Sequence, residues 1–321
     1  MIQSFTVTNH TGKSMVCDLA NPWKEGLAVV SIEGLTPGQA TINVADISSI
    51  DGGLFNSARL SSRNIVINLV FVDHSTLTIE DLRRKCYFYF PIKKNIKLKF
   101  TTGDGKTTKD FLIEGYVESN EPTIFSVSEG SSISIICTNP YFYRPIEQEE
   151  IFNAQANPEF FFEFSKDPVL EENTKLLMGD IVDYELSSIV YDGDADTGAV
   201  FEITFKNDVN HEIEDQKIRI SNSLTNTLNI ISLDKIEKFM ENIDEYDGIV
   251  EGDKIIFSTV KGEKYLTYIH DNIKYNILNA VIPSGEWVYL TNGVNIISIR
   301  KTDPDLQFST VSKNKIYFYG V

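Results

Sequence analysis

Three carboxylates at alternate positions are the feature of this chain that most resembles a chemical site. They belong to the segment Asp192-Gly193-Asp194-Ala195-Asp196-Thr197-Gly198, whose acidic side chains could chelate calcium as an EF-hand loop does. That loop also needs glycine at its sixth position and glutamate at its twelfth, where this chain has Thr197 and Ile203. The sequence therefore predicts an acidic turn. Asp192, Asp194 and Asp196 are disfavoured as metal ligands, and we expect no metal and no cofactor.

Motifs for catalysis are weak in this sequence. The four histidines lie far apart, at His10, His74, His211 and His270. Gly105-Lys106-Thr107 resembles the end of a phosphate-binding loop, but Phe100 stands where that loop needs its first glycine. A glycosidase needs two carboxylates a set distance apart, and the 32 acidic residues after Pro145 are too many for spacing to single out a pair. We expect no catalytic residues and no enzyme, with a cell-wall glycosidase as the weakest alternative.

Aromatic residues could bind sugars by stacking on their rings, and the chain has 20 Phe and 14 Tyr beside Trp23 and Trp287. In an all-β protein such residues more often fill the core between sheets. We assign the run Phe160, Phe161, Phe162 and Phe164 to a core. Sugar binding stays open as an alternative function of the chain, that of a carbohydrate-binding adhesin that contacts a host surface.

The charge of the chain changes abruptly near Pro145. Residues 1–145 carry 14 basic and 14 acidic side chains, whereas residues 146–321 carry 15 basic and 32 acidic ones, so the formal net charge of −17 lies wholly in the second part. Such a step suggests two modules with different surfaces. An acidic chain is a poor match for nucleic-acid phosphates or for an anionic membrane, so we expect no membrane and no specific nucleic acid among its partners.

Most segments have the composition of short strands, with aromatic and β-branched residues between turn residues. In the first part we expect strands at Gln3–Thr8, Leu27–Ile32, Asn64–Val72, Ile96–Thr101, Phe111–Glu118 and Ser132–Cys137. In the second part we expect them at Phe160–Phe164, Ser187–Tyr191, Val200–Lys206, Lys217–Asn222, Thr227–Ile231, Asp253–Thr259, Lys264–Tyr268, Glu286–Leu290, Gly293–Arg300 and Lys315–Tyr319. Many short strands at regular spacing favour a β-sandwich or jelly roll.

Helices are expected at two places. Thr78 precedes two acidic residues, as at a helix N-terminus, and Leu82, Cys86 and Phe90 then recur on one face until Pro91 ends the helix. A shorter helix is expected within Leu233–Ile243.

The signals for targeting and for disulfides are slight. The first ten residues contain no basic segment followed by an apolar one, so the sequence does not predict a secretory signal. Cys17, Cys86 and Cys137 are too few and too irregularly spaced for a disulfide framework, which predicts buried free thiols in a protein folded in a cytosol.

Several short motifs, taken in order, resemble those of the siphophage distal tail proteins, the tail-hub or baseplate family. In the first part they are Ile32-Glu33-Gly34-Leu35, Asp51-Gly52-Gly53-Leu54-Phe55, Arg63 before an apolar strand, the helix Leu82–Phe90 that ends in Phe-Pro, Gly115-Tyr116-Val117, and Cys137 with Asn139-Pro140-Tyr141-Phe142. In the second part they are Tyr191-Asp192-Gly193-Asp194 with Thr197-Gly198, Glu251-Gly252-Asp253, and Trp287-Val288-Tyr289-Leu290 with Gly293. The region Leu233–Asp247 departs from the family pattern as an insertion.

This resemblance implies a mainly β fold with two domains. Residues 1–145 would form an N-terminal, β-barrel-like hub domain with one helix, which builds a six-fold ring. Residues 146–321 would form an acidic, galectin-like or carbohydrate-module-like β-sandwich that projects outward.

The resemblance also implies a structural function without enzymatic activity. Such a chain would be a virion component at the distal end of the phage tail, assembled in the host cytoplasm, with phage DNA passing through its ring. Its partners would be other copies of itself in a homo-hexamer, the tail tube protein, the tail-tip or tail-associated protein, and a receptor-binding protein. A neutral first part avoids like-charge repulsion when copies meet, so we expect residues 1–145 alone to form the ring. The sequence identifies neither the host nor the receptor.

Overall fold

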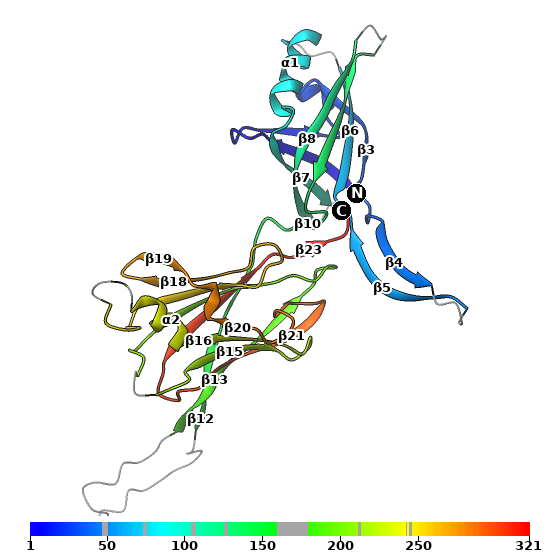
Figure 1. The fold of residues 1–321 in the computed structure, drawn as a ribbon. Helices are drawn as coiled ribbons and strands as arrows, with labels where there is room; N and C mark the ends of the chain where they lie inside the picture. Colours follow the sequence, from blue (N-terminus) through cyan, green and yellow to red (C-terminus); the bar gives the residue numbers. More distant parts are fainter. Residues whose placement is uncertain are drawn as a thin grey trace, which may run out of the picture. The chain divides into compact units, whose positions relative to one another are not determined.

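The computed structural model describes residues 1–46, 51–72, 76–103, 107–124, 128–158, 179–210, 213–241, 243 and 246–321, with side chains omitted for 153–158 and 179–184. The chain forms two compact units, one made of Met1–Ile146 with Tyr317–Val321 and the other of Glu147–Ile316. Both units consist mainly of antiparallel strands (Figure 1), so the predicted mainly β class is confirmed. No helix in the described ranges is long and apolar enough to cross a membrane.

The first unit is built on a nine-stranded antiparallel sheet. Its strands are β1 (Ile2–Thr8), β2 (Ser14–Asp18), β3 (Leu27–Glu33), β6 (Arg63–Phe71), β7 (Asn95–Gly103), β8 (Thr108–Thr123), β9 (Gly130–Cys137), β10 (Phe142–Tyr143) and β23 (Tyr317–Phe318). Seven of them follow the order β2-β1-β7-β8-β9-β6-β3, while β10 pairs with β8 and with β23. The two ends of this order, β2 and β3, also contact each other, so the sheet curls around its core.

One helix, α1 (Ile79–Tyr89), covers part of this core. The Thr78 hydroxyl accepts a hydrogen bond from the Asp81 amide at 3.2 Å, and the Asp81 carboxylate accepts one from the Thr78 amide at 3.0 Å. This capping box satisfies two amides at the start of the helix. Leu82, Cys86 and Phe90 are buried, so the predicted helix and its apolar face are confirmed. All three cysteines are buried free thiols, as predicted, and burial raises the pKa of Cys86 to about 11.

The second unit contains two six-stranded antiparallel sheets. One consists of β11 (Gln148–Ile151), β22 (Phe308–Asn314), β14 (Val200–Phe205), β17 (Lys254–Ser258), β18 (Tyr265–His270) and β19 (Ile273–Asn276), in that order. The other consists of β12 (Asn153–Pro158), β13 (Gly179–Tyr191), β21 (Gly293–Lys301), β15 (Lys217–Asn222), β16 (Thr227–Ser232) and β20 (Val281–Ile282), in that order. Alternate residues along β14 and β22 are buried, the pattern of a sandwich with its core between two sheets.

The remaining elements are short. They are the helix α2 (Leu233–Met240), the 3-10 turns η1 (Pro22–Lys24) and η2 (Leu278–Ala280), and the hairpin strands β4 (Ala40–Asp46) and β5 (Gly53–Leu60). The predicted helix within Leu233–Ile243 is thus present and ends three residues earlier, at Met240.

The structure differs from the predicted strands in several places. Glu286–Leu290 is not a strand: Leu290 forms only an isolated bridge with Thr197, and the Val288 amide donates to the side chain of Asn229. The aromatic and aliphatic residues there serve burial instead of sheet pairing. Lys315–Tyr319 yields only β23, Tyr317–Phe318, which belongs to the first unit although the sequence assigned it to the second. The hairpin β4–β5 was not predicted, and neither were the strands β2, β10, β11, β12, β19, β20 and β22. Phe160–Phe164 lies outside the described residues.

Arg63, at the start of β6, binds four carbonyl groups in three separate segments of the first unit. It is 6% exposed, and its guanidinium donates to the carbonyl oxygens of Gly34 and Thr36 at 2.6 Å, of Pro140 at 2.7 Å and of Tyr319 at 2.6 Å. The same group lies 4.8 Å from the centre of the Phe142 ring, within reach of a cation–π contact. Burial lowers the pKa of Arg63 from its usual value.

Glycine is required beside this guanidinium. Gly34 has a φ of +84°, and a Cβ there would lie 2.1 Å from the backbone oxygen of Asn64. Only glycine combines that backbone angle with that close approach. The loop that presents two carbonyls to Arg63 therefore depends on this residue type.

We expect Arg63→Met to destabilise the first unit by about 4 kcal/mol, because it leaves buried carbonyls without donors while preserving side-chain length. Chemical denaturation followed by circular dichroism measures the loss, and hydrogen exchange of the peptides around Pro140 and Tyr319 locates it. Arg59→Met, at an exposed position on β5, is the control and should change stability by less than about 0.5 kcal/mol. Equal stability of the Arg63→Met variant and the wild type would contradict this account of Arg63.

Candidate assembly site

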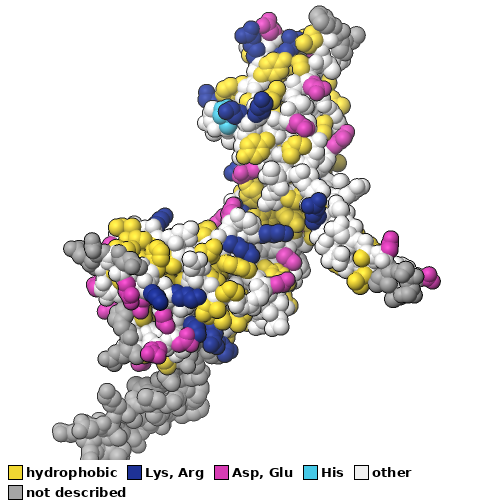
Figure 2. All heavy atoms as spheres, in the orientation of Figure 1, with side chains coloured by type: hydrophobic (Ala, Val, Ile, Leu, Met, Phe, Trp, Pro, Cys, Tyr) yellow, Lys and Arg dark blue, Asp and Glu magenta, His cyan; other side chains and the backbone are white. Residues whose placement is uncertain are grey.

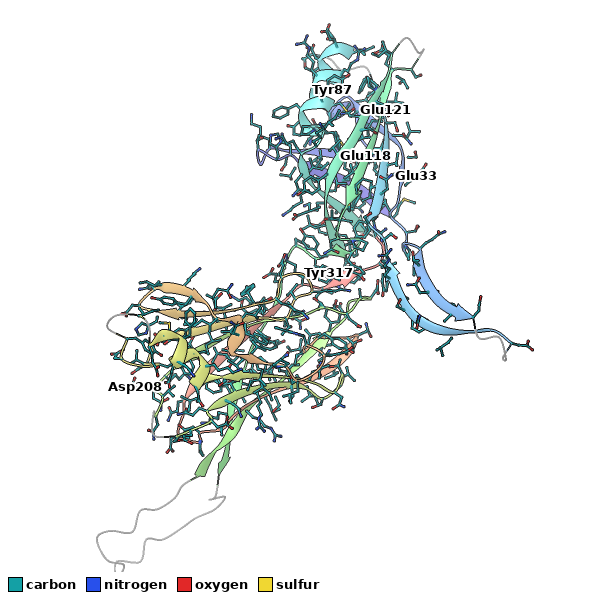
Figure 3. The ribbon with its side chains drawn as sticks, in the orientation of Figure 1. Glu33, Tyr87, Glu118, Glu121, Asp208 and Tyr317 are labelled. Atoms are coloured by element: carbon teal, nitrogen blue, oxygen red, sulfur yellow. The ribbon has the colours of Figure 1, made fainter. Side chains whose placement is uncertain are left out.

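The two strands that connect the units pair with each other inside the first unit. In β10 and β23, Phe142 lies opposite Phe318 and Tyr143 opposite Tyr317, which is labelled in Figure 3. Chain residues 147–316 therefore leave from β10 and return through β23. The second unit is an insertion whose two ends start from adjacent strands.

Aromatic side chains fasten this strand pair to the core of the first unit. The Phe142 ring meets that of Phe100 edge to face with centres 6.0 Å apart, and Phe318 meets Phe111 in the same way at 5.2 Å. The Tyr143 hydroxyl donates to the Glu114 carboxylate at 2.6 Å, and burial together with this carboxylate raises the pKa of Tyr143 above its usual value. The position where the chain returns is thus held by packing as well as by Arg63.

The hairpin β4–β5 has one apolar face that its own chain does not cover. Its strands form a separate two-stranded sheet, in which Val44 lies opposite Phe55 and Ile42 opposite Ala58. Ile42 is 60% exposed, Val44 56% and Phe55 63%, and hydrophobic side chains reach the surface of the hairpin in Figure 2. An isolated two-stranded hairpin is marginally stable in water. This face therefore has the character of a protein contact surface.

The opposite face of the hairpin is polar along most of its length, with Ala45 and Leu54 as its apolar pair near the tip. Thr41 lies opposite Arg59 and Asn43 opposite Ser57, with the Asn43 amide donating to the Ser57 hydroxyl at 2.9 Å. The hairpin therefore has a polar side suited to water and an apolar side suited to another protein. The sequence contains the signal for this arrangement in the alternation Ala40, Ile42, Val44, but the glycines on either side obscured it.

The acidic segment at Asp192 is a structural turn. The side chains of Asp192, Asp194 and Asp196 are exposed, and among the described residues no group of three acidic, histidine or cysteine side chains is arranged to hold a metal ion. The buried hydroxyl of Tyr191 donates to the carbonyl of Ala195 at 2.6 Å. The Thr197 amide donates to the Leu290 carbonyl at 3.0 Å, and the Leu290 amide donates to the Thr197 carbonyl at 2.7 Å. These contacts anchor the turn through its buried residues.

Among the other residues weighed from the sequence, Trp287 contacts neighbouring side chains of the second unit. His74 and His211 lie outside the described residues, as does most of Gly105-Lys106-Thr107. Trp287 is partly buried, stacked at 5.4 Å on Phe257, with the Lys264 ammonium 4.5 Å from its ring centre. Both of these neighbours compete with a sugar for the surface of the indole.

His270 belongs to a buried cluster that the sequence analysis missed. The Asp253 carboxylate, on a residue 4% exposed, accepts hydrogen bonds from the Tyr268 hydroxyl and the Val250 amide, and His270 Nδ1 lies 3.0 Å from it. Burial raises the pKa of Tyr268, and the Asp253 carboxylate adds to this effect. The Tyr268 hydroxyl in this cluster is held by its hydrogen bond to the Asp253 carboxylate. These contacts attach the loop before β17, which contains Val250 and Asp253, to the β18 residues Tyr268 and His270.

We expect Gly198→Ala to destabilise the second unit by about 2 kcal/mol or more, because its Cβ would lie 2.4 Å from the backbone carbon and oxygen of Thr259. Thermal unfolding measures the change. Asp196→Asn, at an exposed position in the same turn, should leave Tm unchanged. Added calcium should leave the Tm of the wild type unchanged as well. A calcium-dependent rise in Tm that Asp196→Asn abolishes would instead identify a metal site.

Comparison with known proteins supports the fold. No protein-family model and no curated protein matches the chain. Among solved structures, the SPP1 Dit (gp 19.1) protein, described as a paradigm of the hub adsorption apparatus in phages that infect Gram-positive hosts, aligns with a TM-score of 0.57 and 13% identity. The alignment covers 98% of this chain and 99% of that one.

Two further structures align at lower similarity. The phage P2 baseplate in its activated conformation with Ca aligns with a TM-score of 0.46, 12% identity and 98% coverage of both chains. The form of that baseplate with Sr aligns with a TM-score of 0.45, 12% identity and 97% coverage of both chains. Scores this low add no weight of their own. The SPP1 match extends over both units, so the resemblance to distal tail proteins that the sequence motifs indicated is confirmed at the level of the fold: the chain has the fold of a phage tail hub protein.

Proposed function

We propose that this chain is a structural subunit of a siphophage tail hub and that copies of it assemble into a closed ring. The observation that carries the proposal is the match over both units to a hub protein. Because fold alone does not fix function, the uncovered hairpin face supplies independent support: it is a surface that a soluble monomer would leave in contact with water.

The hairpin suits the contact that a ring needs. A closed ring is built from head-to-tail contacts, in which a surface on one copy meets a different surface on the next. An apolar face on an amphipathic hairpin can supply one side of such a contact. The balanced charge of residues 1–145 removes the repulsion that would oppose bringing several copies together.

The finer parts of the proposal follow from the resemblance to distal tail proteins. The ring would be a homo-hexamer at the distal end of the tail and would join the tail tube to the tail tip. The acidic second unit would lie on the outside, where the receptor-binding apparatus is attached. In this proposal the protein has no catalytic role.

Light scattering of the purified full chain tests the proposal. We expect a particle of six-fold monomer mass for the wild type. Val44→Asp with Phe55→Asp should shift it to monomer, because two charges on the apolar face cannot be buried without partners.

Thr41→Asp with Ser57→Asp is the matched control, since it places the same charges on the polar face of the same hairpin. This control should assemble as the wild type does. A wild type that stays monomeric at high concentration, or a Val44/Phe55 variant that assembles like the control, would refute the role of the hairpin in ring formation.

Light scattering of a fragment of residues 1–145 cannot test the ring as cleanly as the full chain does. That truncation removes β23 and the Tyr319 carbonyl that accepts from Arg63. Failure of the fragment to assemble would then reflect lost folding as readily as lost contacts. The ability of residues 1–145 to form the ring remains a prediction.

A further inference from the structure

The interior of the second unit contains a polar seam along β22. Thr310, Ser312 and Asn314 alternate along this strand, and all three are buried, with exposed fractions of 0%, 0% and 3%. Alternate residues of a strand point to the same side, with successive side chains about 7 Å apart. Because their neighbours on the same face of β14, Phe201 and Ile203, are also fully buried, this side faces the core.

Polar groups from two other strands join this seam. Gln148 on β11 lies directly opposite Asn314. Glu185 on β13, in the other sheet, is 6% exposed; burial raises the pKa of its carboxyl group, and the Thr310 hydroxyl, as a hydrogen-bonding neighbour, lowers it. The seam therefore includes side chains of both sheets.

Apart from the contact between Thr310 and Glu185, the seam contains buried polar atoms that have no hydrogen-bond partners within the described part of the protein. They are Ser312 Oγ, Gln148 Oε1, and both Oδ1 and Nδ2 of Asn314. A buried polar atom without a partner costs about 1–3 kcal/mol, and so many in one place is rare in native proteins. The seam accordingly requires an occupant that can both donate and accept hydrogen bonds.

We propose that a row of buried water molecules occupies this seam and bridges Ser312, Asn314 and Gln148. Water matches the mixture of hydroxyl and amide groups, since each molecule can donate twice and accept twice.

A metal or alkali cation fits the seam less well. It would need acceptors that converge on one point, whereas the three side chains of β22 are spread over about 13 Å. The charges of Lys206 and Lys301 also act on Glu185 and would repel a cation beside it. Burial raises the pKa of Glu185 to about 7, so its carboxyl group is partly protonated near neutral pH and attracts a cation less strongly.

The position of the seam gives the water a structural consequence. Gln148 and Asn314 lie near Glu147 and Ile316, where the chain enters and leaves the second unit. The strand pair β11–β22 would thus be held by backbone pairing and water instead of by an apolar core. This proposal does not depend on the hub function.

Oxygen-17 magnetic relaxation dispersion of the full chain tests the proposal, because it counts waters that stay bound for long times, whatever the size of the particle. Ser312→Ala should reduce the dispersion amplitude by at least one water and lower Tm. Ser309→Ala, on the opposite side of β22, is the matched control and should change neither quantity.

Two results would overturn the proposal. One is an unchanged dispersion amplitude together with a higher Tm in Ser312→Ala, which would mean that the hydroxyl has no partner at all. The other is an amplitude that changes when sodium is replaced by potassium or when a chelator is added, which would indicate a bound ion. A crystal structure of the wild-type protein provides a check that needs no variant: density for water between Ser312 and Asn314 is expected, and an empty or apolar-filled gap there would contradict the proposal.

Discussion

The first unit depends on one buried guanidinium. Arg63 donates to four carbonyl groups in three segments that are far apart in the sequence, and its charge is balanced by these dipoles and by the Phe142 ring. Arginine suits this position because its planar fork presents several donors in fixed directions and keeps its charge at any ordinary pH. Lysine, a compact point charge, could not reach all four carbonyls. The insertion of the second unit is possible because Arg63 and the pair β10–β23 hold both of its ends.

This constraint connects the fold with the proposed assembly. The carbonyls of Gly34 and Thr36 fix the segment that leads into β4, and β5 runs back toward Arg63 at the start of β6. The uncovered hairpin is therefore anchored at its base to the same residue that secures the return of the chain. An anchored base lets a hairpin present an apolar face to a neighbouring copy while its polar face stays in water.

Local sequence patterns predicted the parts of the fold in which local and tertiary preferences agree. The strand Lys217–Asn222 and the capped helix after Thr78 are examples, because alternation and capping are encoded within a few residues. The hairpin β4–β5 escaped prediction because the glycines on either side of it, Gly38 and Gly52-Gly53, are typical of a loop. The strand β23 was assigned to the wrong unit, since no local pattern reveals which sheet a returning chain will join.

The candidate sites show the same limit. The acidic segment at Asp192 was predicted as a turn from the residues it lacks as a calcium loop, and the absence of a metal there stays a prediction. The role of Arg63 was indicated only by its resemblance to a family motif. Its four acceptors are far from it in the sequence, so spacing along the chain could not reveal that they lie close together. The polar seam was not predicted either, because Thr310, Ser312 and Asn314 have the composition of a surface strand and only the second sheet reveals that they are buried.

Electron cryo-microscopy of the purified full chain tests the central claim most directly. The account predicts closed six-fold rings in which the apolar face of each β4–β5 hairpin is covered by the neighbouring copy. Particles that are monomeric, or rings in which Ile42, Val44 and Phe55 remain exposed to solvent, would contradict it.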